Sequence, residues 1–153
     1  MILDAYALIA FLEDEPAASV VEALLQDRDI TTWTTAVTVA EVIDRLSRTG
    51  RTSADEAAAD VAQLGLFVSP VDAQLGVLAG SLRATGYHRT RSPLSLADCV
   101  VAAEALRARV PLATADPALL DVVASRGGSY IALPASDGSV HTPAVLHFGA
   151  PLA

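Results

Sequence analysis

Short apolar segments alternate with helical segments along most of this 153-residue chain. The segments 1–3, 66–69, 112–114 and 130–133 read as buried strands, and 29–33 is a further candidate strand. Helical patterns separate them, over 5–12, 16–26, 36–48, 53–64, 72–85, 95–109 and 117–125. Strands that are apolar on both faces and joined through helices form a parallel sheet covered on each side. The alternation predicts an α/β fold, a three-layer α/β/α sandwich whose central sheet has four to five mostly parallel strands.

The composition is sufficient for one hydrophobic core. A length of 153 residues, of which 52% are apolar, needs neither disulfides nor a structural metal to fold. Cys99 is the only cysteine, and its apolar helical surroundings favour an inert core thiol. The sequence has no apolar run of membrane-spanning length, and its first residues lack the features of a signal peptide. We therefore expect a cytoplasmic protein without membrane contact.

The last part of the sequence differs from the rest. Residues 134–153 are rich in Pro, Gly and Ser, have little helical pattern, and contain a turn signal at Ser136–Ser139. The residues before them contain no linker, repeat or low-complexity segment. We expect one compact domain over 1–133, followed by a C-terminal tail or hairpin over 134–153.

The charge restricts the class of partner. A formal net charge of −8 argues against a protein that coats nucleic acid through cation–phosphate contacts. It is compatible with a nuclease, because carboxylates that bind a metal ion count as negative in the metal-free chain. All ten basic residues are arginine, the side chain best suited to bidentate phosphate contacts.

Four acidic residues fall where a parallel sheet is expected to bring them together. Asp4 and Asp116 follow predicted strands and precede helices, and such positions line the carboxyl edge of an open α/β sheet, where ligands bind. Asp98 lies in the first turn of its helix, above an apolar stripe. Glu41 lies in the middle of the helix over 36–48, one position from its apolar seam.

Each acid also has a purely structural explanation. Asp4 and the pair Asp116–Pro117 suit the start of a helix. The segment Ser95–Asp98 resembles a capping box, and Glu41 with Arg45 has the spacing of an i, i+4 surface ion pair. Taken one at a time, these positions favour caps and an ion pair over a functional site.

Taken together, the four acids predict a metal site. Caps need no mutual arrangement, whereas these acids lie on elements expected to converge on one edge of the sheet. Several carboxylates in one pocket repel one another unless a cation is present, so the cluster indicates a hard divalent ion. Oxygen ligands without a convincing histidine favour Mg²⁺ or Mn²⁺ over Zn²⁺.

Four short stretches give the chain a family resemblance. In this order and spacing they resemble the PIN-domain ribonucleases, and specifically the VapC-type toxins of bacterial toxin–antitoxin pairs. The stretches are Ile2–Ala10, Val39–Val42, Leu96–Cys99 and Leu112–Asp116. The resemblance covers roughly residues 1–133.

The resemblance implies a PIN-like fold and metal-dependent cleavage of single-stranded or structured RNA. It implies a homodimer, a cognate antitoxin protein that covers the site, and a cofactor that is Mg²⁺ or Mn²⁺. Thr114 matches a hydroxyl residue that supports the last acid, whereas Tyr6 stands where the family commonly has Ser or Asn. The implied catalytic and metal-binding residues are Asp4, Glu41, Asp98 and Asp116.

Other polar residues have weaker signals. The segment Arg83–Arg91 is the densest positive stretch, so Arg89 and Arg91 are candidate phosphate contacts. An equally favoured interpretation is a solvated loop whose charges balance nearby acids. Helix-surface ion pairs are the favoured role of Arg45, Arg48 and Arg51. The three histidines lack metal-ligand spacing and are favoured as structural or surface residues: His88, His141 and His147. Trp33 is favoured as a core residue.

Three alternative functions follow from the same residues. A phosphatase with Asp4 as nucleophile lacks a second Asp two residues on, where Tyr6 stands. A receiver-like acidic pocket needs a Lys, and the sequence has none. A catalytically weak PIN-like module for protein binding or autoregulation is the third, and a metal titration distinguishes it from the nuclease.

Overall fold

The computed structural model describes residues 1–48, 50, 52–89 and 92–143. Within these ranges the strands are β1 (Ile2–Leu3), β2 (Trp33–Thr35), β3 (Phe67–Ser69), β4 (Leu112–Thr114) and β5 (Tyr130–Ala132). The helices are α1 (Ala5–Leu12), α2 (Ala18–Gln26), α3 (Ala36–Arg48), α4 (Ala54–Gln63), α5 (Ala73–Gly86), α6 (Leu96–Ala108) and α7 (Pro117–Ser125).

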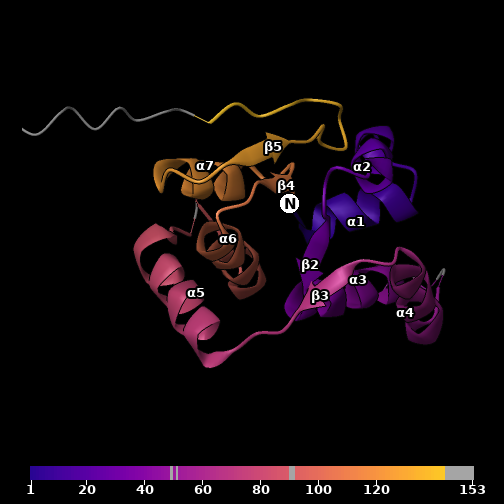
Figure 1. Cartoon of the computed structure of the whole chain (residues 1–153), viewed down its shortest axis with the longest axis horizontal. Coiled ribbons are helices and arrows are strands. Elements are labelled where there is room, and N and C mark those ends of the chain that lie inside the picture. The colour runs from indigo at the N-terminus through magenta and orange to yellow at the C-terminus, as the bar shows by residue number, and fades with distance from the viewer. Residues whose placement is uncertain (49, 51, 90–91, 144–153) are drawn as a thin grey trace, which may run out of the picture.

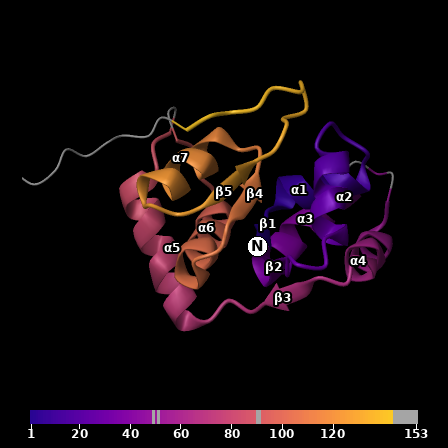
Figure 2. The same ribbon diagram turned by 45° about the horizontal axis from the view of Figure 1, so that its top comes forward.

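The five strands form one parallel sheet in the order β3-β2-β1-β4-β5. Helices α1 to α4 lie on one side of it and α5 to α7 on the other (Figures 1 and 2). The predicted three-layer α/β/α sandwich is therefore confirmed. From β1 the chain first builds the sheet toward β3 and then returns to add β4 on the other side of β1, so the strand order reverses between β1 and β4. Ligand sites of open α/β sheets lie at such a reversal.

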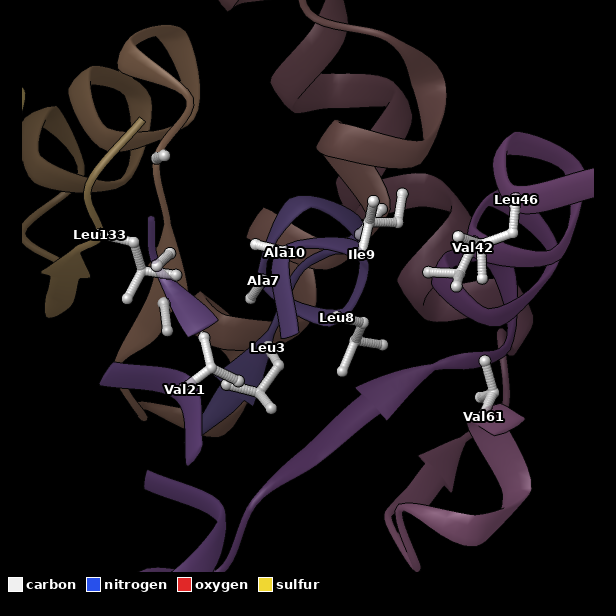
Figure 3. Close-up of a cluster of buried hydrophobic side chains, with 14 of the residues drawn as sticks. Leu3, Ala7, Leu8, Ile9, Ala10, Val21, Val42, Leu46, Val61 and Leu133 are labelled. Atoms are coloured by element: carbon white, nitrogen blue, oxygen red, sulfur yellow. The ribbon is translucent and has the colours of Figure 1, made fainter. Parts of the chain in front are cut away.

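Alternating residues of the central strands separate two hydrophobic cores. Ile2 and Leu112 are fully buried and face α5, α6 and α7. Leu3 and Ala113 point the other way, into a cluster that includes Leu8 and side chains of α2, α3 and α4 (Figure 3). Because strand side chains alternate between faces, two or three residues per strand are enough to bind both helical layers.

Strand β2 differs from its predicted position. The apolar pattern predicts a strand over 29–33, whereas the structure has it at Trp33–Thr35, with Trp33 opposite Ile2. Thr34 and Thr35 are buried although they are polar, because their hydroxyls are satisfied. The Thr34 hydroxyl donates to the Leu3 carbonyl at 2.8 Å, and the Thr35 hydroxyl lies 2.9 Å from that of Thr38. Internal hydrogen bonds of this kind remove the cost of burying a hydroxyl.

After β5 the described chain, up to residue 143, contains no further strand. The predicted turn is present: the Ser139 carbonyl accepts from the Ala135 N–H at 2.7 Å, and Gly138 has a φ of 79°. His141 pairs with Asp121 of α7 at 2.9 Å. Residues 144–153 lie outside the described ranges, so the boundary predicted at residue 133 remains a prediction. No helix in the described ranges is both long and apolar enough to cross a membrane.

Candidate functional site

The four predicted acids line one pocket of about 220 Å³ at the carboxyl edge of the sheet. Topology brings them there. Asp4 and Asp116 follow β1 and β4, the two strands between which the order reverses. Helix α3 starts directly after β2 and carries Glu41 in its second turn, and α6 presents Asp98 in its first turn.

Asp4 is the deepest of the four and is only 4% exposed. Its Oδ1 accepts from the Ala7 N–H at 2.8 Å, which caps α1. The pKa of Asp4 is raised to about 7, chiefly by burial and in smaller part by the charges of Asp116 and Asp98, against the opposing effect of its hydrogen bonds to Thr114 and Ala7. None of the ion pairs among the described residues includes Asp4. A buried carboxylate whose neighbours are carboxylates is a position where a cation is strongly favoured.

The Thr114 hydroxyl joins the first and last acids. It donates to Oδ2 of Asp4 and accepts from the backbone N–H of Asp116 at 3.0 Å. Thr114 is fully buried at the end of β4. One hydroxyl therefore fixes the position of the Asp4 carboxylate relative to the backbone that carries Asp116.

Asp98 and Asp116 cap helices and line the pocket at the same time. Asp98 Oδ2 accepts from the Ser95 N–H at 2.6 Å, and the Ser95 hydroxyl accepts from the Asp98 N–H at 3.0 Å, which completes a capping box. Asp116 Oδ1 accepts from Ala118 at 2.7 Å and from Leu119 at 3.2 Å. The structural and functional interpretations of these acids are thus compatible, because a cap uses one carboxylate oxygen and leaves the other for a ligand.

Arg45, which pairs with Glu41, is the only cationic side chain among the described residues that line the pocket. The closest side-chain atoms of Arg45 and Glu41 are 4.0 Å apart. Partial burial raises the pKa of Glu41, and the charge of Asp98 adds to the rise while Arg45 opposes it. The predicted ion pair is present, but it lies in the pocket wall and not on a remote helix surface.

The chemistry of the donors fits a divalent ion such as Mg²⁺ or Mn²⁺. Four carboxylates supply only oxygen ligands, which these ions prefer. As the side chains stand, no three His, Cys, Asp or Glu side chains of the described ranges converge closely enough to bind one ion together. The capping bonds explain this, since they draw the Asp98 and Asp116 carboxylates back toward their own helices. To bind one ion together, these carboxylates would have to turn from their capping positions toward the centre of the pocket.

Tyr6 lines the pocket without directing its hydroxyl to the acids. The hydroxyl donates to the Pro134 carbonyl at 2.8 Å and so ties α1 to the segment after β5. Burial raises the pKa of the Tyr6 phenol, with nearby hydroxyl and carboxyl groups contributing less. The contact gives Tyr6 a role in holding the C-terminal segment, which the sequence did not predict.

Arg89, one of the two candidate phosphate contacts, does not line the acidic pocket. Arg89 is exposed in the loop after α5, where His88 and Ser92 form a short antiparallel bridge. Arg91, Arg51 and His147 lie outside the described residues. Cys99 is buried beside Asp98, and burial raises the pKa of its thiol, as an inert core residue requires.

Among the residues of the pocket wall that sequence reasoning did not assign to the site are Arg45 and Thr38. Arg45 was predicted as half of a surface pair, although its spacing from Glu41 could have linked it to the site. Thr38 is buried, and its hydroxyl is bonded to that of Thr35. Nothing in its sequence context separates it from an ordinary helix residue.

Comparisons with known proteins agree with this fold. The model of the PIN domain family matches residues 1–124. No curated protein matches the chain. Three similar solved structures are FitAcB from Neisseria gonorrhoeae, a toxin–antitoxin complex from Klebsiella pneumoniae, and VapBC2 from Rickettsia felis bound to a DNA fragment from its promoter.

The likeness to these structures is one of fold. For FitAcB the identity is 20% and the TM-score 0.58, over 84% of this chain and 94% of the other. For the Klebsiella complex the identity is 18% and the TM-score 0.55, over 75% of this chain and 85% of the other. For VapBC2 the identity is 15% and the TM-score 0.57, over 75% of this chain and 86% of the other.

Proposed function

The chain belongs to the PIN domain family, and from this premise we propose that it is a Mg²⁺- or Mn²⁺-dependent endoribonuclease. PIN domains are generally metal-dependent nucleases. The substrate of the proposed reaction is single-stranded or structured RNA, and the bond cut is a phosphodiester. Membership of this family leaves no support for the phosphatase and receiver alternatives.

One observation carries the proposal: a buried carboxylate, Asp4, lies among other carboxylates at the reversal of strand order. Burying a charged carboxylate among like charges is costly unless a cation compensates it. A fold that needed only helix caps could use a neutral residue at Asp4, because Ser, Thr and Asn cap equally well. The acidic cluster is therefore explained by a bound divalent ion and is left unexplained by capping alone.

We assign Asp4, Asp98 and Asp116 as the direct ligands of the ion, with Glu41 holding a second ion or orienting water. A divalent ion held by these carboxylates would supply an activated water for attack on the phosphodiester and positive charge near the leaving oxygen. Thr114 holds Asp4 and Asp116 in register through its two hydrogen bonds. Arg45, beside Glu41, is positioned to pair with a substrate phosphate at the mouth of the pocket.

The proposal extends to partners. One solved structure of similar fold is a toxin–antitoxin complex, which supports a role as the toxin of such a pair, acting in the cytoplasm and inhibited by a cognate antitoxin protein. We also propose a homodimer, which a mass measurement in solution tests directly. Residues 1–133 form the nuclease domain of this proposal, and 134–153 form its C-terminal extension.

A cleavage assay tests the activity. Purified protein is incubated with a total small-RNA pool in EDTA, Mg²⁺ or Mn²⁺, beside the Asp98→Asn variant. We expect metal-dependent cutting that the variant loses while it stays folded. Asp44→Asn is the matched control, because Asp44 lies on α3, pairs with Arg48 and does not line the pocket. Full activity of Asp98→Asn contradicts the site, and no cutting in any metal favours the protein-binding module.

A further inference from the structure

We propose that a second hollow, next to the acidic pocket, binds a nucleobase of the RNA strand beside the cut. This inference rests on the proposed nuclease function and adds a subsite to it. The hollow lies between the C-terminal half of α5 and the first turn of α6, and its volume is about 440 Å³. Its described lining residues are Gly80, Arg83, Ala84, Tyr87 and Leu96.

The hollow and the acidic pocket share the start of α6. Leu96 faces the hollow, whereas Ala97 and Asp98 line the acidic pocket. Residues two positions apart on a helix point in nearly opposite directions, so the first turn of α6 separates the two sites by the width of one helix end. A strand whose phosphate reaches Asp98 can therefore lay a neighbouring base over Leu96.

The surface of the hollow suits a flat, apolar ligand. Leu96 is 60% exposed and the Tyr87 residue 46% exposed, although both are large and apolar. The Arg83 guanidinium stacks on the Tyr87 ring, 4.7 Å from its centroid. Arg83 is itself held by a hydrogen bond of 3.3 Å from its Nε to the Leu94 carbonyl. An aromatic ring and a guanidinium plane are the groups on which unpaired bases stack.

The charge of the segment around the hollow is positive, which suits the negatively charged backbone of an RNA strand. Between Ala73 and Ala97 the sequence has no Asp or Glu, and the described part of this segment contains Arg83 and Arg89, in a chain whose net charge is −8. This segment comprises α5, the following loop and the start of α6. Phosphates of a strand that approaches from this side meet positive charge before they reach the acidic pocket, which needs its metal to accept them.

Gly80 lines the hollow and places no side chain in it. It lies inside α5, where Gly is less favourable than Ala. A Cβ at Gly80 would meet no atom within 4 Å, so the neighbouring structure does not require a glycine there. The same holds for Gly76, one turn earlier on α5, which does not line the hollow. The two glycines thus provide a test site and its matched control.

The test combines RNAs that lack one base with protein variants changed at one side chain, and compares their cleavage. After the cut site is mapped, a series of short single-stranded RNAs is prepared, each with one abasic nucleotide at a position around the cut. The value of kcat/KM with Mn²⁺ is measured for the wild type, Tyr87→Ala, Tyr87→Phe, Gly80→Leu and Gly76→Leu. Circular dichroism and the melting temperature verify that every variant is folded.

One abasic position should lower kcat/KM of the wild type by roughly five- to 150-fold, the range of one base–aromatic stack. Tyr87→Ala should cause a comparable loss with the intact RNA and no further loss with that abasic RNA. Tyr87→Phe should retain the wild-type value, because the ring is kept. Gly80→Leu should reproduce the loss by filling the hollow, and Gly76→Leu should behave as the wild type.

The outcomes separate this inference from the function on which it rests. If the wild type cuts RNA and the abasic penalty is unchanged in Tyr87→Ala, the base subsite is wrong and the nuclease assignment stands. If Gly80→Leu alters only the mass in solution and leaves kcat/KM unchanged, the hollow serves contacts between protein chains instead. If the wild type neither cuts nor binds any RNA, both proposals fail together.

Discussion

The Thr114 hydroxyl donates to the Asp4 carboxylate, which follows a strand more than a hundred residues earlier in the chain. Because the same oxygen accepts from the Asp116 N–H, it couples the neighbouring strands β1 and β4 at the point where the strand order reverses. The side chain is thus a structural link between two acids that we assign to one metal ion.

Replacing Thr114 with Val should therefore destabilise the protein by about 1–3 kcal/mol, because a buried carboxylate oxygen loses its donor. Thr114→Ser keeps the hydroxyl and should recover most of that free energy. Urea unfolding at pH 8 in EDTA measures both. Equal stability of the Val and Ser variants would show that the hydroxyl contributes nothing beyond its volume.

The raised pKa of Asp4 predicts how the free energy of unfolding of the metal-free protein depends on pH. The pKa of Asp4 is about 7 in the folded state, against the ordinary value of 3.8 for an Asp side chain exposed in the unfolded chain, so between these values the folded state binds more protons than the unfolded state. The free energy of unfolding then falls as pH rises through this window and levels off above about pH 7. Asp4→Asn removes the group and should be more stable than the wild type at pH 8 in EDTA, by a few kcal/mol at most.

The measurement is the difference in melting temperature between Asp4→Asn and the wild type, from pH 4 to pH 8. Titration of groups that do not interact with Asp4 cancels in that difference. We expect it to grow with pH and then become constant. A difference that is independent of pH would mean that the folded state does not alter the pKa of Asp4.

Capping and metal binding can be separated at α6. Ser95→Ala removes the hydroxyl that caps the Asp98 N–H and should cost about 1 kcal/mol of stability while metal-dependent cleavage is retained. Asp98→Asn keeps an oxygen that accepts from the Ser95 N–H and should preserve stability while cleavage is lost. Thermal unfolding and the RNA assay are run on both variants. The reverse pattern would make Asp98 a structural residue only.

A second buried carboxylate, Glu104, is explained by structure. Its oxygens accept from Ser69 at 2.9 Å and from Arg107 Nε at 2.8 Å, and Arg107 also binds Asp72 at 2.8 Å. The network fastens α6 to the loop that follows β3. Arg107→Ala should cost up to about 3 kcal/mol, because it leaves Glu104 without a cation.

Adding Glu104→Gln to Arg107→Ala should recover part of that loss, because the unpaired charge is removed. Urea unfolding gives the coupling between the two positions. Cleavage per folded molecule should stay at the wild-type value in both variants, since neither residue lines the acidic pocket. A specific loss of cleavage would link this network to the site.

The sequence predicts the parts of this fold in which local signals and tertiary structure agree. Residues 36–48, 112–114 and 117–125 have the predicted bounds because a clear apolar period or a Pro at the helix start defines them. The convergence of the four acids was also predictable, since strand ends and helix starts of a parallel sheet share one edge. Strand β2 was misplaced because two of its residues are threonines, whose burial depends on partners that the local pattern does not contain.

The remaining features of the site depend on contacts between distant parts of the chain. The Tyr6 hydroxyl binds the Pro134 carbonyl, and no local pattern links these positions. The hollow at Tyr87 and Leu96 lies between α5 and α6, and one of its lining residues is Gly80, which sequence alone marks only as a weak helix former.

The central claim is that Asp4, Glu41, Asp98 and Asp116 bind a divalent ion. A calorimetric titration of the metal-free protein with Mn²⁺ at pH 8 tests it most directly, on the wild type, Asp4→Asn, Asp98→Asn and the control Asp44→Asn. We predict saturable binding that Asp4→Asn and Asp98→Asn abolish or severely weaken and that Asp44→Asn leaves unchanged. Equal binding by all four proteins, or no saturable binding by the wild type, would contradict the assignment.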